Sequence, residues 1–93
     1  MRRILLALTL IPGAAMAQSD TDKAHALVLP MIQEIQPGPA GEVLTGCIVS
    51  AATPEEIATF AAAPGPSAEI GAVINGILQR PAALQCLQAA AQG

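Results

Sequence analysis

Cys47 and Cys86 are the residues of this 93-residue chain whose type and spacing best suit chemistry. They lie far apart in the sequence, so they do not form the C-x-x-C pair typical of redox or metal sites. The single histidine, His25, has no neighbouring residues with which to ligate a metal. We therefore favour a structural disulfide, with a metal site and free or intermolecular thiols as the alternatives. A bridge between these cysteines would span 39 positions of the sequence. On the chain-entropy model, closing a loop of that length stabilises a fold by roughly 4 kcal/mol.

No combination of side chains in the sequence indicates catalysis. His25 falls near the start of a predicted helix, where an exposed side chain is expected rather than a positioned base. The serines lack the G-x-S-x-G context of a nucleophile, and haem, calcium and phosphate motifs are absent. Glu55 and Glu56 have the residue type of an acid–base pair, but the first turn of a helix also favours carboxylates. We expect a protein that is not an enzyme and needs no cofactor.

Residues 1–17 have the layout of a secretory signal peptide. Two arginines precede an apolar stretch over residues 4–11, a Pro-Gly pair breaks this stretch, and residues 15–17 have the A-x-A pattern of a cleavage site. We predict cleavage after Ala17, which leaves residues 18–93 as a single small helical domain. The expected location is periplasmic or secreted, where two cysteines meet an oxidising environment.

The chain that would remain after cleavage is acidic. It keeps all seven acidic residues but only Lys23 and Arg80 as basic residues, which gives a formal charge of −5. An acidic surface repels nucleic acid and anionic lipid, and one aromatic residue offers little surface for stacking bases. No apolar run reaches the roughly 18–20 residues of a membrane span. We expect no nucleic-acid partner and no membrane span after signal cleavage.

Glycine and proline divide the rest of the chain into five segments whose apolar residues have helical spacing. The clearest local signal is residues 53–56, Thr-Pro-Glu-Glu, which combine an N-cap, a proline at the first helical position and a capping box. The first helix is predicted over residues 20–36, with Ser19 or Asp20 as its cap. Pro30 should kink or split it, because the proline ring clashes with a preceding carbonyl group.

The apolar stripes of these segments predict the core. The residues expected to face it are Leu27, Val28, Met31, Ile32 and Ile35 in the first segment, Val43, Leu44, Cys47, Ile48 and Ala51 in the second, Ile57, Phe60 and Ala61 in the third, Ile70, Val73, Ile74, Ile77 and Leu78 in the fourth, and Ala83, Leu84, Cys86, Leu87, Ala90 and Ala91 in the fifth.

Residues 70–78 carry two competing signals. Their apolar residues follow the i, i+3, i+4, i+7, i+8 spacing of a helix that Ser67 could cap. Asn75-Gly76 between β-branched residues instead favours a hairpin. The helical pattern is the longer one, so we predict an all-α fold, a small bundle of four to five short helices joined by one disulfide between Cys47 and Cys86.

Three further expectations concern small residues between helices, apolar residues in excess of those that a small core can bury, and Arg80. Close approach of helices is expected at Gly46, Ala51, Gly71 and Ala72. Surplus apolar residues either complete the core or form an exposed patch for a partner helix or an apolar ligand, and examples are Leu29, Met31 and Val49. Arg80 either complements the negative C-terminal end of the fourth helix or pairs with a partner protein.

A small exported all-α domain with two cysteines broadly resembles the HdeA-type acid-stress chaperones of the periplasm. The resemblance covers size, helix content and the cysteine pair, and carries over no other residue. It implies an acid-activated holdase that exposes apolar surface once its carboxylates are protonated. Our leading expectation is a non-enzymatic binding or accessory module for another protein of the periplasm or envelope, and a carrier of a small apolar ligand is a further alternative.

Overall fold

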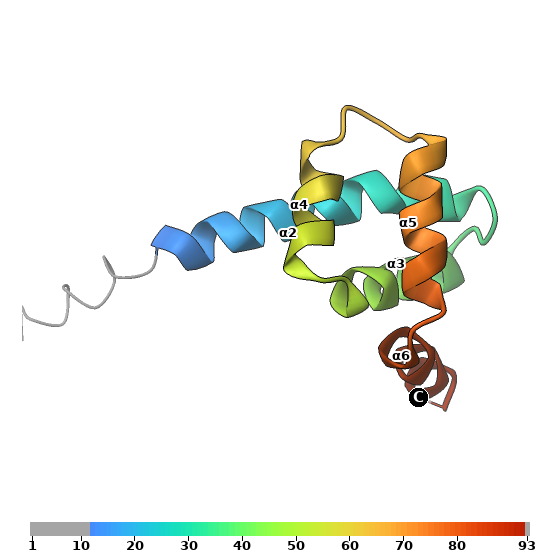
Figure 1. Cartoon of the computed structure of the whole chain (residues 1–93). Coiled ribbons are helices and arrows are strands. Elements are labelled where there is room, and N and C mark those ends of the chain that lie inside the picture. The colour runs from blue at the N-terminus through green and yellow to red at the C-terminus, as the bar shows by residue number, and fades with distance from the viewer. Residues whose placement is uncertain (1–11, 93) are drawn as a thin grey trace, which may run out of the picture.

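Five helices make up the part of the chain that the structure describes, residues 12–92 (Figure 1). In this computed structural model the helices are, in chain order, α2 (Pro12–Gln33), α3 (Pro39–Ala51), α4 (Pro54–Ala62), α5 (Ala68–Leu78) and α6 (Pro81–Gln92). No strand forms within these residues, so the predicted all-α fold is confirmed. Residues 70–78 are helical, and Ser67 caps them by accepting a hydrogen bond from the backbone N–H of Ile70 at 3.2 Å.

Helix α2 begins earlier than the sequence pattern predicts. It starts at Pro12 and runs without a break through residues 15–17, so neither Ser19 nor Asp20 caps it. Proline is favoured at the first helical position because the N–H that it lacks would have no partner inside the helix. The basic and apolar parts of the predicted signal peptide, residues 1–11, lie outside the described residues. Cleavage after Ala17 stays a prediction.

Pro30 lies inside α2 without splitting it. A proline in a helix interior removes one backbone hydrogen bond, but α2 packs closely against both α3 and α4. This packing stabilises the helix across the proline, so of the two expected outcomes, a kink or a split, the split does not occur. Among the described helices, α2 included, none has the length and apolar content needed to span a membrane.

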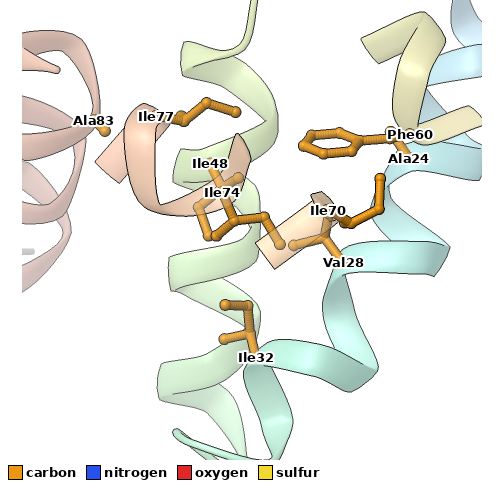
Figure 2. Packing of buried hydrophobic residues seen from close by; sticks show 9 residues of the cluster. All are labelled: Ala24, Val28, Ile32, Ile48, Phe60, Ile70, Ile74, Ile77 and Ala83. Atoms are coloured by element: carbon orange, nitrogen blue, oxygen red, sulfur yellow. The ribbon is translucent and has the colours of Figure 1, made fainter. Parts of the chain in front are cut away.

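The core lies between α2, α3, α4 and α5 (Figure 2). Three of its largest fully buried side chains are Phe60 of α4, Ile48 of α3 and Ile77 of α5. The buried cluster comprises Ala24, Val28, Ile32, Ile48, Phe60, Ile70, Ile74, Ile77 and Ala83. The stripe predicted for α5 is confirmed in full, because its remaining members, Val73 and Leu78, pack against this cluster.

Five apolar side chains that the stripes assigned to the core are exposed instead, and two of them are the small side chains of Ala90 and Ala91 in α6. Ile35 is 77% exposed because it lies beyond the end of α2, in the turn to α3. Val43 of α3 and Leu84 of α6 are 44% and 47% exposed. Val49 is buried, so of the two alternatives for the surplus apolar residues it follows the one in which they complete the core.

The turn between α2 and α3 depends on glycine at two positions. Gly38 has a φ of +79°, a conformation that L side chains rarely adopt. Its N–H donates to Oε1 of Gln33 at 2.8 Å, and its carbonyl accepts from Nε2 of the same side chain at 3.2 Å. At Gly41 an added Cβ atom would clash with the backbone carbonyl oxygen of Gln36.

Other glycines do not serve the close helix approach that the sequence predicts. Nothing lies within 4 Å of a Cβ atom built at Gly46 or Gly71, and Ala72 is exposed. Ala51 is the member of this group that packs against the core cluster. The expectation is therefore wrong for Ala72 and for both glycines, which stand in helix interiors with open space beside them.

The environments of Gly41 and Gly71 predict that substitution by alanine changes the free energy of unfolding in opposite directions at the two positions. Gly41→Ala should lower the free energy of unfolding by about 1–3 kcal/mol, because the methyl group forces the backbone apart. Gly71→Ala should raise it by roughly 0.5–1 kcal/mol, because glycine weakens a helix interior and the added methyl group meets no neighbour. Urea unfolding followed by far-UV circular dichroism measures both values. Effects of the same sign would contradict this description of the two sites.

Candidate functional site

The disulfide connects α3 to α6. The Sγ atoms of Cys47 and Cys86 are 2.07 Å apart, and their Cα atoms are 5.6 Å apart. Cys47 is buried and Cys86 is half-buried. Neither cysteine is free, so the thiol and metal alternatives do not describe this oxidised form.

Helix α6 is only lightly embedded in the molecule. Ala83 is its buried residue, and its contacts are mainly with α3, with fewer to α5. In Figure 1 it lies at the edge of the molecule, beyond the end of α5. Residues 81–92 contain no charged side chain. The position of α6 therefore depends heavily on the bond from Cys86 to the buried Cys47.

An ion pair between Glu56 and Arg80 connects α4 to the link between α5 and α6. The Nη1 atom of Arg80 donates to Oε1 of Glu56 at 2.7 Å, and Nη2 donates to Oε2 at 2.5 Å. Nη1 also donates to the carbonyl oxygen of Ala51 at 3.2 Å. The sequence suggested that Arg80 complements the negative C-terminal end of α5. Because Ala51 is the last residue of α3, Arg80 instead compensates the negative C-terminal end of α3.

Glu56 has a second role at the start of α4. Its Oε1 accepts the backbone N–H of Thr53 at 2.9 Å, while the hydroxyl oxygen of Thr53 accepts the N–H of Glu56 at 3.2 Å. The predicted capping box is therefore confirmed. One carboxylate thus joins a helix cap to an ion pair with a residue far along the chain.

Acid should weaken the fold through this carboxylate. The hydrogen bonds from Arg80, followed by those from Thr53, lower the pKa of Glu56 from 4.5 to about 2. A carboxyl group with a lowered folded-state pKa contributes stability above its unfolded pKa and loses it as the pH falls through the folded pKa. We expect the melting temperature of the protein to fall between about pH 4.5 and 2.

The variant Glu56→Gln should remove this part of the pH dependence. At neutral pH it should also lower the melting temperature by several degrees, because both the ion pair and the charged cap are lost. Glu55→Gln is the matched control, since it removes a carboxylate from the same helical turn. Thermal unfolding across this pH range measures both effects. Identical pH profiles for the two variants would contradict the role assigned to Glu56.

An uncharged apolar surface extends along α3 and α6, and we name it the α3–α6 face. An open cavity of about 440 Å³ lies along it, with Val43 and Leu87 among its lining residues. Leu84 lies one turn before Leu87 on the same stripe of α6. The face is defined by Ala40, Val43, Leu84, Leu87, Ala90 and Ala91. Sequence reasoning missed it because it assigned these stripes to the core.

A second cavity, the His25 pocket, has a volume of about 540 Å³ and lies where α2, α3 and α4 meet. The buried Val49 and the half-buried Ile57 belong to its apolar lining. Its residues are Asp20, Thr21, His25, Gly46, Val49, Ser50, Ala52, Pro54 and Ile57. His25 is half-buried rather than exposed, because α2 starts earlier than predicted and places it in mid-helix.

The polar side chains of the His25 pocket do not form a recognisable catalytic arrangement. In the described part of the chain, no hydrogen bond joins His25 to a serine or a carboxylate. The hydroxyl of Ser50 donates to the carbonyl of Cys47 at 3.5 Å, within its own helix. Among residues 12–92, no three His, Cys, Asp or Glu side chains gather as a metal site would require.

Comparison with protein-family models, curated proteins and solved structures finds no match for this chain. The resemblance to HdeA-type chaperones gains no support from these comparisons and stays a hypothesis. The α3–α6 face and the His25 pocket must therefore be interpreted from their own geometry and chemistry.

Proposed function

We propose that this chain is an exported, non-enzymatic binding module that docks another protein of the periplasm or envelope through the α3–α6 face. One observation carries the proposal. Val43 and Leu84 are 44% and 47% exposed on two helices in contact, on a surface whose defining residues are all uncharged. The surrounding chain has a formal charge of −5 over residues 18–93.

The composition of the face supports docking of a protein. Depletion of charged residues at the centre is the feature that distinguishes protein interfaces from other surface. Exposed apolar groups gathered on one side are also the usual mark of an interaction site. A partner helix with an apolar stripe fits this chemistry, because its side chains can lie along the cavity between α3 and α6.

The disulfide supports the same proposal. The α3–α6 face has one wall on each of two helices, and Cys47 and Cys86 join those helices covalently. A wall that is already held in place costs less entropy to order when a partner binds. An oxidising compartment, which the predicted signal peptide implies, would keep this bond formed.

The test compares capture of envelope proteins by the wild-type chain and by charged variants. Val43→Glu and Leu84→Glu place a carboxylate on the α3–α6 face, whereas Ala72→Glu places one on an exposed position of α5. The same partner should be retained by the wild type and by Ala72→Glu, and lost with both variants of the face. Circular dichroism checks that all variants fold. Equal retention by every variant, or no retained protein at all, would contradict the proposal.

A further inference from the structure

The His25 pocket has the size and lining of a small-molecule site. Its volume of about 540 Å³ falls within the roughly 300–1,000 Å³ that is typical of such sites. Three helices supply its walls, and apolar side chains such as Val49 and Ile57 line it. Both side chains are at least half-buried. An alkyl chain placed against them would lose contact with water, which is the main driving force for apolar binding.

The polar lining of the pocket selects the sign of the ligand's charge. Asp20 is half-buried, and it supplies the acidic side chain among the lining residues. The described ion pair of the protein joins Glu56 to Arg80, which leaves Asp20 without a salt bridge to a described lysine or arginine; His25 is the other titratable side chain of the lining. Lys23, on the same helix, is exposed and does not line the pocket. A carboxylate beside an apolar wall attracts a cation more strongly than one in open water.

We propose that the His25 pocket binds a small amphiphile that carries one cationic group, with an alkylamine as the simplest example. The alkyl chain packs against Val49 and Ile57, and the ammonium group lies beside Asp20. The acidic charge of the chain adds to this preference, because a cleft lined by one sign of charge concentrates ligands of the other sign. An anionic amphiphile with the same alkyl chain would meet repulsion from Asp20. This site is separate from the α3–α6 face and does not depend on a partner there.

Three probes with the same alkyl chain test the proposal: n-octylamine, 1-octanol and octanoate. Each is titrated, below the concentration at which it self-associates, into the oxidised ¹⁵N-labelled chain. The amine should bind about tenfold more tightly than the alcohol, and octanoate should bind most weakly. Amide shifts should appear at Gly46, Ser50 and Ile57. Added salt should reduce the advantage of the amine.

Three variants separate the role of charge from the role of shape. Asp20→Asn should remove the preference for the amine and leave octanol binding unchanged. Gly46→Leu should abolish binding of the amine and the alcohol, because its side chain enters open space at the pocket. Gly76→Leu, at an equally open glycine of α5, is the control and should bind like the wild type. Equal affinity for all three probes, shifts confined to the α3–α6 face, or unchanged binding by Gly46→Leu would overturn the proposal.

Discussion

Replacing both cysteines with alanine should lower the free energy of unfolding by about 4 kcal/mol. The bridge between Cys47 and Cys86 closes a loop of 39 positions in sequence. Closing such a loop restricts the unfolded chain, which is the main source of the stabilisation. Since a core of this size supplies only about 3–5 kcal/mol, the expected loss is comparable to everything else that holds the fold together. Alanine is chosen because a serine hydroxyl at the buried Cys47 would need a hydrogen-bond partner.

Denaturant unfolding of the Cys47→Ala, Cys86→Ala variant measures this loss. We also expect amide exchange in α6 to accelerate more than in α2 or α4, because α6 contributes little to the core besides Ala83. The reduced wild-type chain is the control and should behave like the variant, which excludes an effect of the substituted side chains themselves. A loss under about 1 kcal/mol would contradict the structural role of the bridge.

Replacing Phe60 with alanine should cost about 3–5 kcal/mol of unfolding free energy. Phe60 is the single aromatic residue of the chain and is 1% exposed. Figure 2 shows its ring pointing into the buried cluster, to which Ala24 and Ile70 also belong. Helix α4 is short and packs mainly against α2, so the ring is its principal anchor. The cavity left behind would be surrounded by branched side chains that fill it poorly.

Urea unfolding of Phe60→Ala should therefore give a free energy of unfolding close to zero. Thr59→Ala, at the neighbouring exposed position of α4, is the matched control and should change the free energy by less than about 0.5 kcal/mol. Because this control alters the same short helix, it separates the loss of the ring from a general effect on α4. Similar midpoints for the two variants would show that the ring is not the anchor described here.

The features that the sequence predicts best are those carried by neighbouring residues. The capping box at Thr53 and Glu56 lies within one helical turn, and the helical spacing of residues 70–78 is longer than the competing hairpin signal. The start of α2 was mispredicted, although the pattern is just as local. Pro12-Gly13 was read as a break, whereas proline is also a favoured first residue of a helix.

The features that the sequence predicts poorly depend on contacts between distant segments. Helical spacing shows that Val43 shares a stripe with Cys47 but does not tell whether another helix covers that stripe. Arg80 pairs with Glu56 at a separation of 24 residues, a pairing without a local signal. The His25 pocket likewise arises where three helices meet. For the α3–α6 face a signal was present, namely the absence of charge from residues 81–92.

The position of Cys86 in the last helix sets the order of events in folding. A polypeptide emerges from the ribosome or a translocation channel with its N-terminal end first, so Cys47 becomes available well before its partner. The helices α2 to α5, which supply nearly all of the buried cluster, can then pack before any covalent bond forms. The bond between Cys47 and Cys86 can therefore form only after residues 48–85 have been synthesised, and a chain truncated before residue 86 would carry an unpaired thiol at Cys47.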